Sequence, residues 1–137
     1  MQITIPYTPR PAFLPFHNRK QRWACLVCHR RAGKTVACIN ELIKCALLEK
    51  KKDGRYAYIA PQYSQAKDVA WGYIKQFTAS IPNVTYNESD LYVTFPNGNR
   101  VRLYGTENES RLRGLYFDGV ILDEYADIHP RDRKSVV

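Results

Sequence analysis

Cys28-His29-Arg30-Arg31-Ala32-Gly33-Lys34-Thr35 is the stretch of this sequence that decides its fold. It matches the phosphate-binding pattern G-x-x-x-x-G-K-[ST], known as Walker A, at every defined position except the first, where Cys28 replaces glycine. An apolar run at residues 23–28 leads into the loop and predicts a buried strand. Apolar positions at helical spacing continue from residue 34 to about residue 50. A strand, a basic loop and a helix in this order are the setting in which the pattern binds phosphate.

The diagnostic residues of this loop have separate chemical roles. Gly33 lets the backbone approach the phosphates, and the amides that open the helix point their N–H groups at the anion. Lys34 is expected to reach the β- and γ-phosphates of ATP, and Thr35 to give its hydroxyl to Mg²⁺. Arg30 or Arg31 could contact the γ-phosphate, although a solvated surface arginine is an equal alternative for each. The expected nucleotide-binding residues are His29, Arg30, Arg31, Ala32, Gly33, Lys34 and Thr35.

A second chemical signal follows the last apolar run, at residues 119–122. Asp123 and Glu124 are adjacent carboxylates at its end, which is the layout of a Walker B element with a catalytic glutamate. Because neighbouring side chains of an extended chain point opposite ways, the two acids can take different roles. Asp123 is expected to hold Mg²⁺, and Glu124 to polarise the water that attacks the γ-phosphate. Two acids at a strand end are usually surface charge, so this interpretation depends on Lys34 and Thr35 upstream.

The order of the other predicted elements indicates an α/β fold. Residues 55–60 read as a strand, and residues 64–80 as a helix with Ser64 as its N-cap. Asn97-Gly98 between two β-rich runs predicts a hairpin across residues 91–104. The fold class is therefore a P-loop NTPase core of the ASCE type, with a mainly parallel sheet flanked by helices and incomplete at the C-terminus. The apolar face of the helix at 64–80 is expected to comprise Ala66, Val69, Ala70, Tyr73, Ile74 and Phe77.

Composition limits the partners and the compartment. The 137 residues include 21 Lys and Arg against 13 Asp and Glu, and the net charge of +8 favours a polyanionic partner such as nucleic acid or nucleotide phosphates. No apolar run approaches the roughly 20 residues that span a bilayer, and the proline-rich start lacks a signal-peptide core. We therefore expect a cytoplasmic protein without a membrane partner. Residues 1–21 read as an irregular lead-in, and residues 22–137 as a partial ATPase domain.

The four cysteines raise one alternative chemistry. Cys25 and Cys28 form a Cys-x-x-Cys pair, which can indicate zinc or redox chemistry. No second pair of ligands follows at a zinc-like spacing. Cys25 lies in an apolar run, and Cys38 and Cys45 are seven residues apart on the predicted helix. We expect these cysteines to be small buried hydrophobic residues.

Three segments together resemble the large subunit of the tailed-phage terminase. They are the loop with its preceding valine (27–35), the Tyr58-Ile59-Ala60-Pro61-Gln62-Tyr63 stretch with its continuation to Lys67, and residues 113–127, from Arg-Gly through the Asp-Glu pair. The likeness covers nearly the whole chain. A basic P-loop that has lost its first glycine is a habit of this family, so Cys28 does not count against the resemblance.

The resemblance implies an ATPase motor that uses ATP and Mg²⁺ to move double-stranded DNA into a bacteriophage or prophage capsid. Its implied partners are the portal protein, the terminase small subunit and further copies of itself in a ring. Arg30 corresponds to the P-loop arginine of the family, and Arg113 resembles its trans-acting arginine finger, although a connector charge is the simpler interpretation of Arg113. The family also leads us to expect a glutamine that contacts adenine, for which Gln21 is a weak candidate.

Two other functions remain open on the sequence alone. The chain could be a non-catalytic remnant whose basic surface binds DNA or a phage protein, or a fragment of a P-loop helicase, which shares both motifs. Only thirteen residues follow Glu124 (137 minus 124), and no further strand or acidic cluster is among them. We expect a fragment that binds nucleotide but hydrolyses it poorly and has no nuclease activity. Poor hydrolysis would be disproved by robust turnover that Glu124→Ala abolishes.

Overall fold

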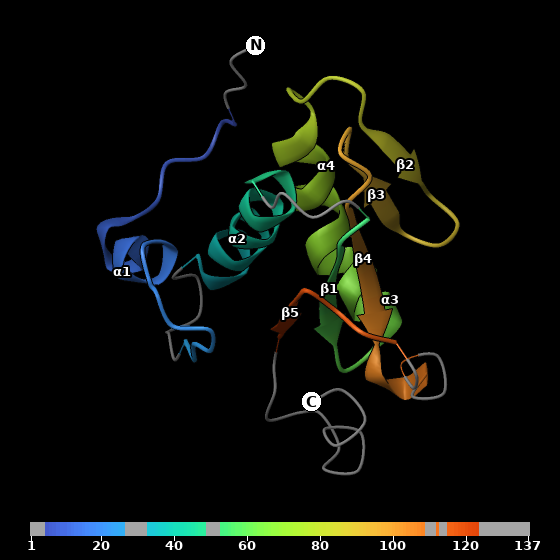
Figure 1. Ribbon diagram of the computed structural model, residues 1–137. Coiled ribbons are helices and arrows are strands. Elements are labelled where there is room, and N and C mark those ends of the chain that lie inside the picture. The colour runs from blue at the N-terminus through green and yellow to red at the C-terminus, as the bar shows by residue number, and fades with distance from the viewer. Residues whose placement is uncertain (1–4, 27–32, 49–52, 109–111, 113–114, 124–137) are drawn as a thin grey trace.

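The computed structural model describes residues 5–26, 33–48, 53–108, 112 and 115–123, and shows a five-stranded sheet with helices packed beside it (Figure 1). The strands are β1 (Arg55–Ala60), β2 (Thr85–Asn87), β3 (Tyr92–Thr94), β4 (Arg100–Gly105) and β5 (Gly119–Leu122). The helical elements are η1 (Pro11–Phe13), α1 (Leu14–His17), α2 (Lys34–Leu48), α3 (Tyr63–Ala66), η2 (Lys67–Trp71), α4 (Gly72–Thr78) and η3 (Thr106–Asn108).

The sheet has the order β2-β3-β4-β1-β5 and is parallel around its centre. β1 pairs in parallel with β4 on one side and with β5 on the other, while β2, β3 and β4 are joined by antiparallel ladders. The predicted α/β class with a mainly parallel core is confirmed. The predicted hairpin is confirmed as β3 and β4, with a positive φ of 86° at Gly98 in its turn. β2 was not predicted, because three residues with exposed or half-exposed side chains give no apolar alternation.

The helix predicted from residue 34 is α2, which runs for 15 residues. Its apolar positions recur every three or four residues and bury one face against β1, β4 and β5. Ile39, Ile43 and Ala46 are completely buried on that face. The hairpin turn satisfies a carbonyl near the other end of α2, since Asn97 Nδ2 and Asn99 Nδ2 both donate to the Ala46 oxygen at 2.8 Å.

The helix predicted at 64–80 is a helical run from Tyr63 to Thr78 with a π-helical segment, η2, in its middle. Its N-cap is Gln62, with no capping bond from its side chain, so the assignment of this role to Ser64 is wrong. The predicted apolar face is also partly wrong. The wider turn of η2 rotates the later residues around the axis, so that Val69 and Tyr73 are exposed while Trp71 is buried.

The strand predicted at residues 23–28 is not found in the part that the structure describes, residues 23–26. Trp23 is 72% exposed, and the guanidinium of Arg22 lies 5.3 Å from the centre of its ring. Cys25 is exposed rather than buried, whereas Cys38 is buried as expected and Cys45 is half-buried. An extended run becomes a strand only when a ladder accepts its backbone groups. Within the described residues β5 pairs only with β1, and no ladder includes 23–26.

The two faces of the sheet carry different clusters. One face packs against α2 and the α3-η2-α4 run, with Tyr56, Tyr58, Val101 and Leu103 in its main core. The opposite face carries a smaller cluster around Ala57 and Ile59 of β1. No helix among the described residues is long and apolar enough to cross a membrane.

Candidate functional site

The phosphate end of the site is the N-terminus of α2. Gly33 has a φ of 88°, a backbone conformation that residues with a Cβ rarely adopt. Its carbonyl accepts the first helical bond, from Ala37 N at 3.0 Å, so the chain turns into the helix at this glycine. Lys34 and Thr35 are partly exposed and occupy the first two helical positions. The amides of this first turn lack helical acceptors, which suits an anion at this end.

Asp123 directly follows β5 and is still held by the sheet. Its backbone N–H donates to the carbonyl of Ile59 at 2.9 Å, which extends the ladder between β1 and β5 by one residue. Its carboxylate accepts a hydrogen bond at Oδ2 from the hydroxyl of Tyr58. These two hydrogen bonds fix both the main chain and the side chain of Asp123. Because the residue is only half-buried, its carboxylate remains accessible.

The alternation of the strands places Asp123 on the helix-covered face of the sheet. Tyr58 and Ile121 are paired across the β1-β5 ladder and both contact the main core. Asp123 lies two residues beyond Ile121 and therefore points to the same face, which agrees with its bond to Tyr58. Because α2 packs on this face and contacts β5, Asp123 and α2 lie on one side of the sheet.

Several predicted site residues lie outside the described part of the chain. These are His29, Arg30, Arg31, Ala32, Arg113 and Glu124. The structure places Gly33, Lys34 and Thr35 at the start of α2 and Asp123 at the end of β5. The catalytic assignments of Arg30, Arg113 and Glu124 therefore stay predictions.

The N-terminal segment contributes a pocket that sequence analysis did not predict. Tyr7, Thr8, Arg10 and Phe13 line a pocket of about 160 Å³ together with Gly33 and Val36. The guanidinium carbon of Arg10 lies 3.5 Å from where a Cβ on Gly33 would be. This segment was predicted to be an irregular lead-in, but it carries η1 and α1 and brings a cation next to Gly33. Proline-rich sequence without periodicity carries no signal for this contact.

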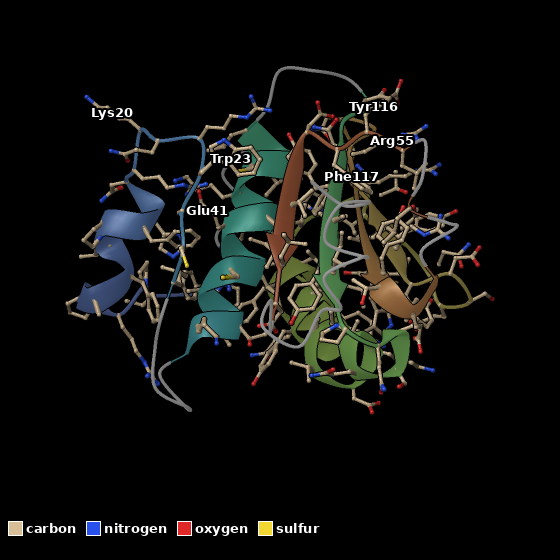
Figure 2. All side chains as sticks on the ribbon, turned by 90° about the horizontal axis from the view of Figure 1, so that it is seen from below. Lys20, Trp23, Glu41, Arg55, Tyr116 and Phe117 are labelled. Carbon is tan, nitrogen blue, oxygen red and sulfur yellow. The ribbon has the colours of Figure 1, made fainter. Side chains whose placement is uncertain are left out.

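A buried cluster of charged and polar side chains connects the N-terminal segment to α2 (Figure 2). Glu41 of α2 lies on the side away from the sheet and accepts hydrogen bonds from His17 Nδ1 at 2.6 Å and from Arg19 at 2.9 Å. His17 Nε2 contacts the hydroxyl of Tyr7 at 2.8 Å. A neutral imidazole with its proton on Nδ1 satisfies both contacts. Burial, and then the nearby Cys38 and Glu41, raise the pKa of the Tyr7 hydroxyl above its ordinary value.

Gln21 lies apart from the phosphate end. It lines a second pocket of about 320 Å³ with residues of the middle and end of α2, including Glu41, Lys44 and Leu48. Gln21 is not among the residues that line the pocket beside Gly33. Its expected contact with adenine stays untested.

Thr35 and Asp123 supply the ligand chemistry that Mg²⁺ prefers. A hydroxyl and a carboxylate are hard oxygen donors, and Mg²⁺ in nucleotide sites takes one or two such groups while phosphates and waters fill the other positions. Among the described residues no group of three or more His, Cys, Asp or Glu could hold a metal ion by itself.

Comparison with models of known families finds a match over most of the chain. The sequence model of the family described as terminase large subunit, T4likevirus-type, N-terminal matches residues 26–137. A comparison with curated proteins found no match.

Comparison with solved structures finds the same fold in large terminases. The large terminase ATPase domain of Thermus phage P74-26 is 23% identical with a TM-score of 0.73, and the match covers 96% of this chain and 61% of that one. The large terminase of a thermophilic bacteriophage is 18% identical with a TM-score of 0.66, over 78% of this chain and 28% of that one. This second protein has also been solved with ADP and with ATP-γ-S. The chain thus spans less than two thirds of these relatives.

Proposed function

Because the chain belongs to the family of terminase large subunit N-terminal domains of the T4likevirus type, we propose that it is the ATP-binding and ATP-hydrolysing core of a DNA-packaging motor. The observation that carries this proposal is the start of α2 at Gly33-Lys34-Thr35, on the sheet face that also carries Asp123. The nucleotides bound to the large terminase of the thermophilic bacteriophage support the same ligand class for this chain.

The residues at the start of α2 have defined roles towards the nucleotide. Gly33 keeps the backbone open to the phosphates, and the free amides of the first turn donate to their oxygens. Lys34 places an ammonium group on the β- and γ-phosphates. Arg10, which lies beside Gly33, adds a second positive charge from the N-terminal segment.

Thr35 and Asp123 are the residues that would hold Mg²⁺. A bound Mg²⁺ would supply positive charge that offsets the negative charge of the phosphates. Glu124, the next residue after Asp123, is proposed to orient that water and accept its proton. Arg113 is proposed to reach the γ-phosphate of a neighbouring copy, which would make hydrolysis depend on assembly.

Double-stranded DNA is the proposed substrate of the motor, and the portal protein and the small subunit are its proposed partners. The net charge of +8 is consistent with a polyanionic substrate. We propose DNA packaging as the activity of a whole large subunit; this chain matches the family of its N-terminal part.

Isothermal titration with ATP in the presence of Mg²⁺ tests the proposal. The wild-type chain is expected to bind, and Lys34→Ala to lose binding because the phosphates lose their ammonium partner. Lys44→Ala is the matched control, since Lys44 lies on the same helix with its Nζ bonded to the carbonyl of His17 at 2.8 Å. Absence of ATP binding by the folded wild-type chain, or equal binding by Lys34→Ala, would refute the proposal.

A further inference from the structure

Tyr58 combines a buried ring with a hydroxyl at the metal-binding end of the sheet. The residue is only 1% exposed, and its ring is part of the main core. Its hydroxyl donates to Oδ2 of Asp123 on the neighbouring strand. A buried phenol needs a hydrogen-bond partner, and here that partner is the acid proposed to hold Mg²⁺.

The register of the sheet explains how Tyr58 reaches this acid. Tyr58 is opposite Ile121 in the parallel ladder, so Asp123 is its diagonal neighbour two residues further along the chain. A diagonal neighbour on the same face is within reach of an aromatic side chain. The adjacent residue, Ile59, accepts the backbone N–H of Asp123 at 2.9 Å. Consecutive residues of β1 thus fix the main chain and the side chain of one carboxylate.

Packing alone does not account for the hydroxyl. A phenylalanine at position 58 would fill the same core volume without placing a polar atom there, and it would need no partner. The hydroxyl instead restricts the rotation of a carboxylate that stands at the half-exposed end of a strand. Hydrogen bonds of this kind to metal-ligating carboxylates orient them, and losing such a bond typically weakens metal affinity by about 10–100-fold.

We propose that Tyr58 is a positioning residue for Mg²⁺ binding, acting through Asp123. Its hydroxyl holds the carboxylate in one orientation, so that Mg²⁺ would meet a preformed ligand. The inference rests on the proposed function, because it assumes that Asp123 binds the metal of a bound nucleotide.

The experiment measures how strongly Mg²⁺ improves ATP binding. The dissociation constant for ATP is determined by calorimetry in excess Mg²⁺ and in EDTA. The constant in EDTA divided by the constant in Mg²⁺ is the ratio that measures the metal-dependent gain in affinity. Tyr58→Phe is expected to reduce this ratio by about 10-fold, the lower end of the range for lost orienting bonds. Its ATP affinity in EDTA is expected to stay at the wild-type level, which a merely structural defect would not allow. Tyr56→Phe is the matched control, since Tyr56 is a buried tyrosine on the same strand and face but is paired with Gly119, at the other end of β5 from Asp123.

A double-mutant cycle tests whether Tyr58 acts through Asp123. Asp123→Ala should lower the ratio, and adding Tyr58→Phe to that variant should lower it no further. The inference is overturned if Tyr58→Phe keeps the wild-type ratio, if Tyr56→Phe lowers the ratio equally, or if Tyr58→Phe still acts in the Asp123→Ala background. If Tyr58→Phe loses ATP affinity in EDTA as well, its role is structural and the inference is also overturned. A wild-type chain that binds no ATP in either buffer refutes the proposed function itself, which is a separate result.

Discussion

Replacing Glu41 by alanine tests the structural link between the N-terminal segment and the helix that starts the phosphate site. The side chain of Glu41 is 7% exposed and accepts hydrogen bonds from His17 and Arg19, whose side chains are 9% and 23% exposed. The alanine variant removes the acceptor of both bonds. The N-terminal segment then keeps its apolar contacts with α2 but loses its buried polar contacts.

The expected loss follows from the burial of this cluster. Removing one partner of a buried ion pair costs about 3–5 kcal/mol, because the remaining charge is left without compensation. Arg19 is partly exposed and water can reach it, so we expect the lower end, about 3 kcal/mol. A chain of this size loses about 4 °C in melting temperature per kcal/mol, which predicts a decrease of about 12 °C. Glu41→Gln keeps an acceptor and should lose less.

Thermal and urea denaturation followed by circular dichroism measure this loss. Lys75→Ala serves as the control, because Lys75 pairs with Glu88 at 3.3 Å but its side chain is 44% exposed, and exposed pairs contribute little. If Glu41→Ala is no more destabilising than Lys75→Ala, the buried cluster does not hold the N-terminal segment to α2.

Three further predictions concern single positions. Asn99→Ala removes two buried side-chain hydrogen bonds and should lower the free energy of unfolding by about 2–3 kcal/mol in urea titrations; a change under about 1 kcal/mol would contradict this. Gly105→Ala places a Cβ 2.3 Å from the backbone nitrogen of Tyr63 and should cost about 2 kcal/mol or more in the same assay, whereas wild-type stability would disprove the close approach. Iodoacetamide at pH 8 should modify exposed Cys25 before Cys45, because burial and then the nearby Glu41 raise the Cys45 pKa and leave less thiolate; peptide mapping that shows equal rates would refute this.

The elements that sequence alone predicted well are those with a local signal. α2 has a helical apolar repeat, β1 and β5 are short apolar runs, and Asn97-Gly98 has the turn chemistry of a hairpin. Each of these signals is contained within a short stretch of consecutive residues. They are therefore readable without knowing which segments meet in space.

The predictions that failed depend on partners distant in the sequence or on a local departure from α-helical geometry. The apolar run at 23–26 has the composition of a strand but no ladder within the described residues, and Trp23 is exposed. Val69 was placed on a buried face because the helical repeat assumes 3.6 residues per turn, which η2 does not keep. Contacts between residues far apart in the sequence give no local signal either: Figure 2 shows Arg55 beside Tyr116, 61 positions later, with the guanidinium 5.3 Å from the ring centre.

The candidate site was also only partly predictable. The motif identified Gly33, Lys34 and Thr35 because its spacing is local, and Asp123 because it ends an apolar strand. Arg10 and Tyr58 were missed, since their contacts with Gly33 and with Asp123 arise from tertiary packing. No periodicity or motif in the sequence marks either residue.

Amide chemical-shift mapping with Mg²⁺ and ATP tests the central claim most directly, because the claim places one nucleotide between the start of α2 and the end of β5. We predict that the largest shifts occur at Gly33, Lys34, Thr35 and Asp123, and that Lys34→Ala removes them. Shifts centred instead on the pocket of Gln21 and Lys44, with none at Gly33 or Asp123, would contradict the account.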